Sequence, residues 1–441
     1  MPQRDEEMRK RQERRKQQQA KRAAEQKRMK RMLILAVLVL IVCGAGLFYM
    51  VGSAEPAEES VQQNQVQKET KPVETTKPKS PVFEDPITTI HIKAAGDLNV
   101  TDEVINAGLA INGYDYSGAF KDVSAILSDA DLTVMNFEGN IYGEPYGTQT
   151  TSAPMQLLTA LRGCGVDLLQ MANSCAINNG LNGLTATLQA IRAAGMEPVG
   201  AFSSDAEFSQ SKGYTITEIQ DIRVAFVAFT KGLGGRGMPA GNENLVNLLY
   251  EDYATEYKKV NRDGIKKILK NVANEDPDLT VAMVHWGSEY SEYSEESSGT
   301  QRTIISLMKK HGVDVILGTH PHVVHPIVYD ETDSTLVAYS LGDFFGDADR
   351  GATNYSIILD IEITKDASAG TTRVTDYSYT PIYTVKKSEC VDRDHRVVRI
   401  DKAIEAWGGN YLDKITDDAK AGMDKALTRI GERVVMPEEE D

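Results

Sequence analysis

The chain has 441 residues, of which 41% are hydrophobic and 25% charged, and its formal net charge is −16. This hydrophobic share is enough for a substantial core and excludes a chain that is disordered throughout. The charge is divided unevenly, because residues 1–31 hold 13 Lys and Arg against 5 Asp and Glu. The rest of the chain therefore carries a net charge of −24, which is unfavourable for nucleic acid as a partner.

An uncharged apolar run over residues 32–51 follows the basic segment. At about 1.5 Å per residue, a helix of this length spans the hydrocarbon core of a bilayer. Because positive segments stay on the cytoplasmic side, we expect residues 1–31 in the cytoplasm and the main domain outside the cell. The alternative is a cleaved signal peptide, for which residues 52–54 offer small side chains. We favour the first arrangement, a single-pass protein of the cell membrane.

Residues 52–86 are rich in Glu, Gln, Lys, Thr and Pro and contain few large apolar side chains. Such a composition cannot bury a core, so we expect a flexible linker that holds the folded domain away from the membrane. Beyond the apolar run the chain has three cysteines, Cys164, Cys175 and Cys390. This odd number implies no complete disulfide framework.

Residues 87–390 alternate short β-rich runs with amphipathic helical stretches, a pattern that predicts an α/β domain. The expected strands are residues 88–97, 131–138, 166–173, 223–230, 278–287, 313–322, 335–344 and 355–363. The expected helices include residues 181–195, 257–275 and 300–312. Residues 391–441 are expected to form a helical tail with an acidic end, and their sequence indicates no function.

Five of the expected strands end in side chains that are able to bind a metal ion. These residues are Asp97, Glu138, Asn173, His285, His320 and His322. Ligands of α/β sheets bind beyond the carboxyl ends of the strands, so we expect these side chains to meet. Each alone has a structural explanation, such as a turn for Asp97 or a hydrogen-bonded core histidine for His285. The six residues together favour a metal-binding site. His325, His91 and His311 do not lie at the ends of expected strands and are not assigned to this site.

Mixed imidazole, carboxylate and amide ligands suit Mn, Fe or Zn better than Ca or Mg. Glu138 is able to bridge two such ions. Two ions about 3.5–4 Å apart generate a hydroxide and stabilise both oxygens of a displacement at phosphorus. The sequence therefore predicts a site for two divalent transition metal ions.

Several motifs between residues 89 and 348 resemble the CapA-type capsule synthesis proteins, a poly-γ-glutamate synthesis family of the calcineurin-like metallophosphoesterase superfamily. They are "AAGD" (94–97), "DLTVMNFEGNI" (131–141), "VDLLQMANSCAINNG" (166–180), "VHWGSEY" (284–290), "HGVDVILGTHPHVVHPI" (311–327) and "YSLGDFF" (339–345). The resemblance implies a four-layer αββα sandwich preceded by one transmembrane helix. It also implies a role in the synthesis or export of an anionic surface polymer, together with the capsule machinery. Asp97, Glu138, His285, His320 and His322 match the family's metal-site positions.

One loop departs from the family pattern, in which an Asn-His pair supplies a metal ligand and the general acid. Ser174 and Cys175 stand in place of that pair, and Asn178 replaces the Asp that would orient the His. Asp343 adds a carboxylate where the family has Asn. In one interpretation, Asn173, Cys175 and Asp343 form a remodelled catalytic site, with the Cys175 thiolate stabilised by nearby cations. In the other, the metal scaffold remains without its general acid, which typically contributes 10²–10⁴-fold.

Three further residues are candidates for contact with a substrate. Arg236 lies in the glycine-rich loop 232–237, which we interpret as a mobile loop over the site, because Pro239 interrupts the helix that a dinucleotide fingerprint needs. Trp286 and Glu289 lie next to His285. Tyr290 is a further candidate for the pocket wall, and both Trp286 and Tyr290 are equally compatible with core packing.

Two functional classes follow. The first is a membrane-anchored metal-dependent hydrolase that acts on a phosphoester, or on an amide or ester in another envelope substrate. The second is a non-catalytic component of a polymer synthesis or export machine that works through the membrane helix and the tail. The net charge of −24 repels a polyanion, so an anionic polymer or phosphoester ligand is expected at a local metal or Arg site, which slightly favours the first class. The family resemblance favours the second, and we expect the family's role with a metal site whose activity the sequence does not decide.

Overall fold

The computed structural model describes residues 87–294, 298–389, 395–405 and 415–435. The predicted basic segment, transmembrane helix and linker lie outside these ranges, as does the acidic end of the chain. Within these ranges, no helix is long and apolar enough to cross a membrane.

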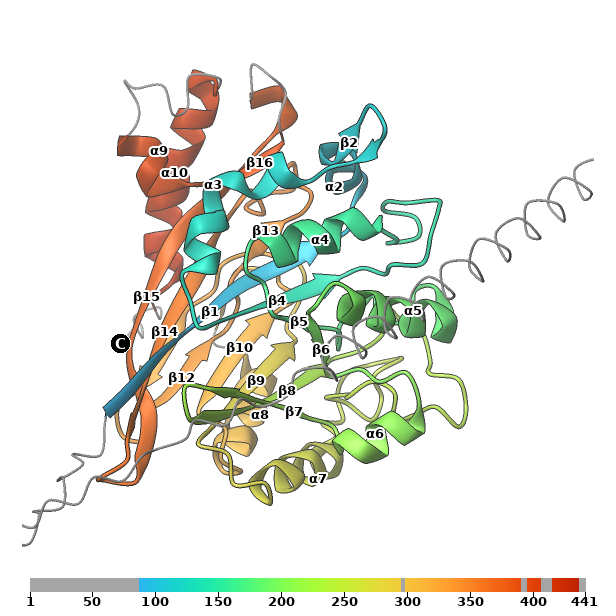
Figure 1. Cartoon of the computed structure of the whole chain (residues 1–441), viewed down its shortest axis with the longest axis vertical. Coiled ribbons are helices and arrows are strands. Elements are labelled where there is room, and N and C mark those ends of the chain that lie inside the picture. The colour runs from blue at the N-terminus through green and yellow to red at the C-terminus, as the bar shows by residue number, and fades with distance from the viewer. Residues whose placement is uncertain (1–86, 295–297, 390–394, 406–414, 436–441) are drawn as a thin grey trace, which may run out of the picture. The chain divides into compact units, whose positions relative to one another are not determined.

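Two β-sheets form the centre of the fold (Figure 1). The larger has the strand order β16–β15–β14–β1–β4–β5–β6, with β13 paired to the end of β1. Its strands are β1 (Ile87–Asn99), β4 (Leu132–Glu138), β5 (Leu168–Gln170), β6 (Glu197–Val199), β13 (Asp343–Phe345), β14 (Tyr355–Asp366), β15 (Thr371–Val385) and β16 (Arg396–Arg399). The smaller has the order β11–β12–β10–β9–β8–β7. Its strands are β7 (Thr215–Ile219), β8 (Ile222–Thr230), β9 (Leu279–His285), β10 (Val315–Thr319), β11 (Ile327–Asp330) and β12 (Thr335–Ala338).

Each sheet has a parallel centre. Strands β1, β4, β5 and β6 run parallel to one another, and so do β12, β10, β9 and β8. The outer strands β14, β15, β16, β7 and β11 are antiparallel to their neighbours. The carboxyl ends of the parallel strands therefore gather at one edge of each sheet, where α/β proteins bind their ligands.

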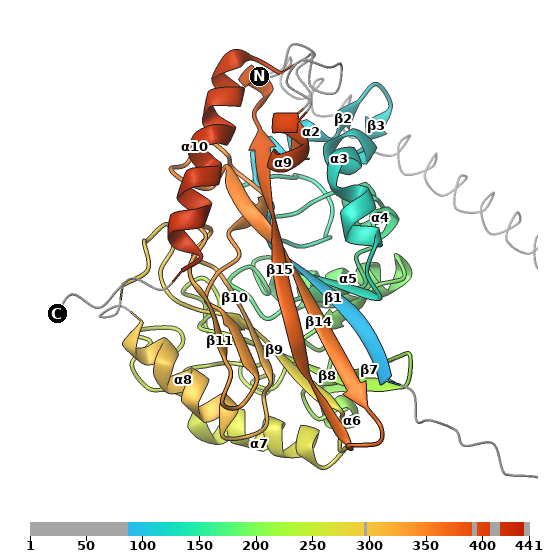
Figure 2. The ribbon, with the colours of Figure 1, turned by 90° about the vertical axis from the view of Figure 1, so that its left-hand side faces the viewer.

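Helices cover the outer faces of the two sheets, so the layers run helix, sheet, sheet, helix (Figure 2). On the side of the larger sheet lie α3 (Ser117–Ser128), α4 (Met155–Gly163) and α5 (Gly180–Ala193). On the side of the smaller sheet lie α7 (Arg262–Ala273) and α8 (Gly299–Lys309). The remaining elements are α2 (Asp102–Ala107), the hairpin β2 (Leu109–Ala110) and β3 (Gly113–Tyr114), α6 (Asp205–Ser211), η1 (Lys387–Glu389), α9 (Ile400–Glu405) and α10 (Asp417–Arg433).

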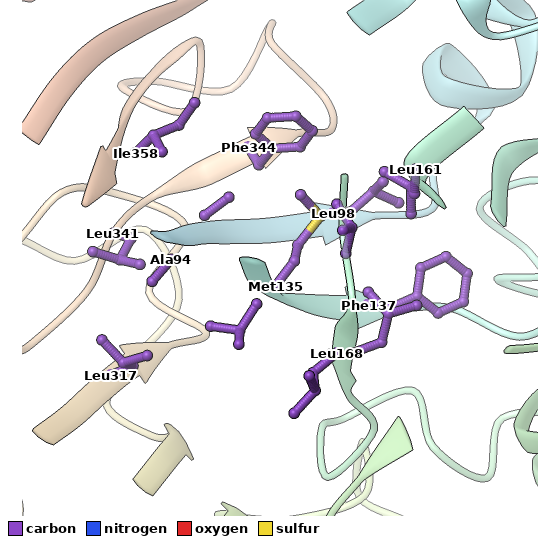
Figure 3. Packing of buried hydrophobic residues seen from close by; sticks show 14 of the residues in the cluster. Ala94, Leu98, Met135, Phe137, Leu161, Leu168, Leu317, Leu341, Phe344 and Ile358 are labelled. Carbon is purple, nitrogen blue, oxygen red and sulfur yellow. The ribbon is translucent and has the colours of Figure 1, made fainter. Parts of the chain in front are cut away.

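The alternation of side chains along β8 shows how the layers are held together. Val224, Phe226 and Ala228 belong to the larger hydrophobic cluster, which also contains residues of β1, β4 and α4 (Figure 3). Ala225, Val227 and Phe229 point to the other face and pack with α7 and α8. A strand buried on both faces needs apolar residues at every position, which explains the continuous apolar run of residues 224–229.

The last helix, α10, packs on β14 and β15 and contacts two loops of the domain. Its C-cap residue Val434 accepts a hydrogen bond from the backbone N–H of Ile327 at 2.8 Å. Arg433 forms an ion pair with Glu292, in the loop that follows β9. The described part of segment 391–441 thus packs on the domain, and it begins with a strand, β16, where a helix was expected.

The predicted α/β class is confirmed, and every expected strand overlaps a strand of the structure. The run 335–344 forms two strands, β12 and β13, because the chain turns at Gly342, which has a φ of 82°.

Candidate metal centre

The polar side chains at the strand ends of both sheets come together. Asp97 and Glu138 lie at the ends of β1 and β4 in the larger sheet, and His285 ends β9 in the smaller one. His320 and His322 follow β10 directly. All five side chains are buried, with at most 5% of their surface exposed. The two sheets therefore each supply part of one buried polar cluster.

The turn that carries His320 and His322 has an unusual backbone. Their φ angles are 92° and 61°, in a region that residues other than glycine rarely adopt. The backbone N–H of His320 donates to Oδ2 of Asp97 at 3.0 Å, which ties the turn to β1. Conformations of this kind persist only where the surrounding structure enforces them, and they concentrate at functional sites.

Asp343 joins the cluster through a close approach of two backbone segments. It is the register partner of Asp97 in the β1–β13 pair, and the N–H of Asp97 donates to the Gly342 carbonyl at 2.9 Å. A Cβ atom at Gly96 would lie 1.8 Å from that carbonyl oxygen. Glycine at position 96 is therefore required to bring the two carboxylates together.

An amide orients the carboxylates of β1 and β4. Nδ2 of Asn136 donates to Oδ1 of Asp97 at 2.6 Å and to Oε1 of Glu138 at 3.1 Å. The hydroxyl of Ser174 donates to the other carboxylate oxygen of Glu138 at 3.1 Å. Both carboxylates are thus fixed in direction by residues that bear no charge.

The histidines complete the cluster in different ways. Nε2 of His285 lies 2.9 Å from Oε1 of Glu138, and its Nδ1 lies 3.1 Å from the hydroxyl of Thr230. Nδ1 of His322 lies 2.7 Å from Asp343 and 3.6 Å from Asp97. Nδ1 of His320 is buried and has no hydrogen-bond partner in the described structure.

Burial and neighbouring charges shift the pKa values of several side chains in the cluster. Burial, with the negative charge of Glu138, raises the pKa of Asp97. Burial also lowers the pKa of His320, and the neighbouring His285 adds to this effect. The pKa of His322 is raised instead, because Asp343 and Glu138 outweigh the effect of burial. A divalent cation would relieve the repulsion among the carboxylates and the cost of burying them.

The side chains present fit a metal ion. Donor atoms of Glu138, His320 and His322 lie within 4.8 Å of one another, and so do those of Asp97, His322 and Asp343. The two groups share His322, and Nδ1 of His320 is without a partner. A buried donor that lacks a partner costs free energy unless something binds it. The described residues thus provide two neighbouring donor groups of the composition that transition metals prefer.

The loop after β5 carries two of the predicted site residues, Asn173 and Cys175. Oδ1 of Asn173 accepts from the backbone N–H of Cys175 at 3.0 Å, so this oxygen closes a turn. Cys175 belongs to neither donor group. Burial and the nearby Glu138 raise the pKa of its thiol to about 12. Stabilisation of the thiolate by a bound cation stays a prediction. Of the proposed replacement ligands, Asp343 lies among the donors and Cys175 does not.

A pocket of about 390 Å³ opens beside the centre. Its wall consists of Ser174, Lys231, Gly232, Gly234, Gly235, Tyr257, His285, Ser288, Glu289 and His320. Glu289 lines it, as expected of a substrate contact. Arg236 lies in the adjacent loop, and its guanidinium donates to Oδ1 of Asn178 at 2.6 Å.

Trp286 does not line this pocket. It is fully buried between the smaller sheet and α8, and its indole N–H donates to the Tyr339 carbonyl at 2.9 Å. The expectation of a substrate contact is corrected here, because side chains alternate along an extended chain and Trp286 points away from the face that His285 occupies.

The place of Lys231 and the contacts of Tyr290 were not predicted from the sequence, although Tyr290 itself was a candidate for the pocket wall. Lys231 follows the last residue of β8 and lines the pocket. On the other side of the centre, the ring of Tyr290 stacks on His322 with centroids 5.1 Å apart, and the guanidinium of Arg350 lies 4.7 Å from the Tyr290 centroid. The position of Lys231 at a strand end was a usable signal, whereas nothing in the sequence links Tyr290 with Arg350.

The fold and the site define a two-sheet α/β protein with a buried carboxylate–histidine centre at the ends of its parallel strands. Residues 91–348, more than half of the chain, match the family model described as bacterial capsule synthesis protein PGA_cap. The chain belongs to this family, which confirms the resemblance to CapA-type proteins.

Two curated relatives are capsule proteins of Bacillus. The chain is 26% identical over 269 residues to "Capsule biosynthesis protein CapA" of Bacillus anthracis, a match that covers 59% of this chain and 61% of the relative. It is 27% identical over 255 residues to "PGA biosynthesis protein CapA" of Bacillus subtilis, over 56% of this chain and 62% of the relative. The match thus spans about three fifths of each relative.

Solved structures with partial similarity include two phosphoesterases. A calcineurin-like phosphoesterase from Bacillus subtilis aligns with a TM-score of 0.41 at 14% identity and covers 79% of this chain and 99% of its own. A phosphatase from Mycoplasma pneumoniae aligns with a TM-score of 0.42 at 13% identity and covers 68% and 95%.

Proposed function

We propose that this chain is a membrane-anchored capsule synthesis protein whose extracellular domain binds an anionic polymer of the poly-γ-glutamate type at a dinuclear metal centre. Family membership and the names of the two Bacillus relatives support the polymer. The apolar run 32–51, preceded by a basic segment, supports the anchor and the orientation. The capsule synthesis and export machinery in the same membrane would be its partner.

The observation that carries the proposal is the pair of donor groups that share His322. One group contains Glu138 and His320, and the other contains Asp97 and Asp343. Carboxylate and imidazole donors in this mixture favour Mn, Fe or Zn. Two bound ions would act as Lewis acids toward carboxylate or phosphate oxygens of a ligand. Asn136 and Ser174 hold the carboxylates in the directions needed for this binding.

The residues beside the centre favour binding over rapid hydrolysis. Cleavage of a phosphoester also needs a general acid for the leaving group. Ser174 and Cys175 occupy the positions of the family's Asn-His pair, so the imidazole that would act as general acid is missing. Neither a hydroxyl nor a buried thiol replaces an imidazole whose pKa lies near neutral pH. We therefore propose slow or absent turnover.

Metal analysis of the purified full-length protein by mass spectrometry tests this proposal. We expect about two transition metal ions per chain, and loss of at least one of them in the His322→Ala variant because both donor groups contain this residue. His325→Ala is the matched control. His325 lies in the same loop, but its Nε2 contacts the Ser291 carbonyl at 2.8 Å and it belongs to neither group. A folded protein that cannot be loaded with metal would refute the proposal.

A second candidate function is hydrolysis of a phosphoester, amide or ester in another envelope substrate. The pocket that opens against His285, His320 and Ser174 favours it, because a substrate there would lie next to the centre. Turnover of a nitrophenyl phosphodiester or of a γ-glutamyl anilide would establish this function if the His322→Ala variant abolished it. The proposed binding function predicts turnover that is absent, or slower by about 10²–10⁴-fold than that of a hydrolase with a general acid.

A further inference from the structure

The pocket beside the centre has opposite charges on its wall that do not pair with each other. Lys231 and Glu289 both line it, and neither forms an ion pair in the described structure. The carboxylate of Glu289 acts against the effect of burial, which lowers the pKa of Lys231, but it also repels an anionic ligand, because like charges repel. The wall is therefore complementary to a group that carries both charges.

Lys231 is held in a defined position. It is half-buried, and its ammonium donates to the Gly287 carbonyl and lies 4.8 Å from the centroid of the Tyr257 ring. Gly232 permits this arrangement, because a Cβ atom there would lie 2.7 Å from the Tyr257 ring. An ammonium group has three donors, so hydrogen bonds remain available to a ligand.

Glu289 differs from Lys231 in its surroundings. Its side chain is exposed, and it has no hydrogen bond or ion pair within the described residues. The loop between β9 and α8 places it on the same wall as Ser288, whose hydroxyl offers a further polar contact. Glu289 is thus free to accept hydrogen bonds from a cationic group of a ligand.

We propose that this pocket binds the amino-terminal residue of a γ-glutamyl chain, with its α-carboxylate on Lys231 and its free α-ammonium on Glu289. This inference rests on the proposed function, since it concerns the same polymer. Residues inside a γ-linked chain carry a free carboxylate but no free amine, so only this end of the chain has both charges. The volume of about 390 Å³ is near the lower limit for small-ligand pockets and suits a chain end better than a long polymer segment.

The net negative charge of the domain also favours binding of the polymer's amino-terminal end. The chain beyond residue 31 carries a net charge of −24 and repels a polyanion over most of its surface. A zwitterionic terminus is the part of such a polymer with the least net charge. Binding at a small, locally complementary pocket is then favoured over contact along the polymer.

The test compares three small ligands by isothermal titration calorimetry with the full chain in detergent. The ligands are the γ-glutamyl-glutamate dipeptide, its N-acetyl derivative and inorganic phosphate. We expect the dipeptide to bind about tenfold more tightly than the N-acetyl derivative, because acetylation removes the charge that Glu289 accepts. Glu289→Gln should lower the affinity for the dipeptide by about tenfold and leave the affinity for the N-acetyl derivative unchanged. Lys231→Gln should lower the affinity for both peptides.

Exposed residues near the pocket provide matched controls. Glu256→Gln and Lys258→Gln remove the same charges from side chains that are 63% and 76% exposed and lie outside the pocket wall. These variants should bind all three ligands as the native chain does. Glu289 is exposed, so Glu289→Gln is expected to fold. This variant tests the inference even if Lys231→Gln fails to fold.

Two results would overturn the inference: equal affinity for both peptides, or binding of phosphate alone with the same dependence on Lys231. The metal content of the same samples separates this inference from the proposed function. Metal-loaded protein that does not discriminate the peptides refutes only the chain-end subsite. Protein that takes up no metal refutes the centre, whichever peptide binds.

Discussion

Nδ1 of His322 lies 2.7 Å from Oδ1 of Asp343, and the two residues come from opposite sides of the centre: one follows β10 of the smaller sheet, the other begins β13 of the larger. Asp343 is also the position at which the family pattern has Asn. A carboxylate at this point adds a negative charge to one of the two donor groups. Under the proposed function, Asp343 on β13 is a donor that compensates for the loss of the Asn-His pair in the loop after β5.

Replacement of this carboxylate tests the compensation directly. Asp343→Asn should weaken binding of Mn²⁺ or Zn²⁺ by about 10–100-fold, since the amide retains the shape but loses the charge. Calorimetric titration of the metal-free protein measures the change. Asp349→Asn, in which an exposed carboxylate is altered six positions away, should bind metal like the native chain. Equal affinity in the two variants would show that Asp343 is not a ligand.

Metal should also stabilise the fold. Without a cation, Asp97, Glu138 and Asp343 lie buried close together, and burial raises the pKa of Asp97 and Asp343. A ligand that binds only the folded state at 100 times its dissociation constant adds about 2.7 kcal/mol to the free energy of unfolding. Thermal unfolding in Mn²⁺ should therefore occur at a higher temperature than in EDTA. Identical midpoints would argue against a metal centre.

The buried position of Trp286 predicts a change in stability. Trp286→Ala should lower the free energy of unfolding by about 3–5 kcal/mol, because it leaves a cavity in the second hydrophobic cluster. Tyr142→Ala, at a side chain that is 49% exposed, should change it by less than about 0.5 kcal/mol. Urea unfolding measures both values, and a small effect at Trp286 would contradict its place in the core.

The pH dependence of stability should have a component from Asp314, which lies before β10. Burial raises the pKa of this carboxyl to about 6, although it accepts a hydrogen bond from the Thr280 N–H at 2.8 Å. Because this pKa lies above the ordinary value of 3.8, the stability that Asp314 contributes is complete below about pH 4 and lost as the pH rises through 6.

Asp314→Asn should remove that loss, since the amide does not titrate. The free energy of unfolding of the variant minus that of the native chain should therefore be about 2–3 kcal/mol larger at pH 7.5 than at pH 4. Urea unfolding at both pH values gives the difference. Glu331→Gln, at an exposed position, should show no such gain, and a parallel pH profile for Asp314→Asn would contradict the assignment.

The sequence predicted the centre better than its surroundings for a physical reason. Asp97, Glu138 and His285 each end an apolar run, and the geometry of parallel strands brings such ends together whatever the loops do. The stack of Tyr290 on His322 depends on loop conformation, which leaves no periodic signal. Trp286 was ambiguous because the sequence alone does not specify toward which side of the extended chain a residue points.

The strands of the fold also divide into those that the sequence predicted and those that it did not. The buried strands were recognisable from continuous apolar residues, as in β8 and β9. Strand β15 was missed because its first half is largely exposed and mixes charged and polar side chains, a pattern that resembles a loop. Strand β16 was missed because it is short and lies in a segment that is otherwise helical.

The ion pair between Arg433 and Glu292 also bears on the order in which contacts become possible during synthesis of the chain. Its two residues are separated by 141 positions, so Glu292 is synthesised long before its partner exists. Glu292 follows Glu289 by three residues in the loop that lines the pocket. This loop gains its contact with α10 only when the last helix has been made, after every donor of the centre is already in the chain. The contact that joins this loop to α10 therefore depends on the C-terminal part of the chain, although Glu292 itself does not line the pocket.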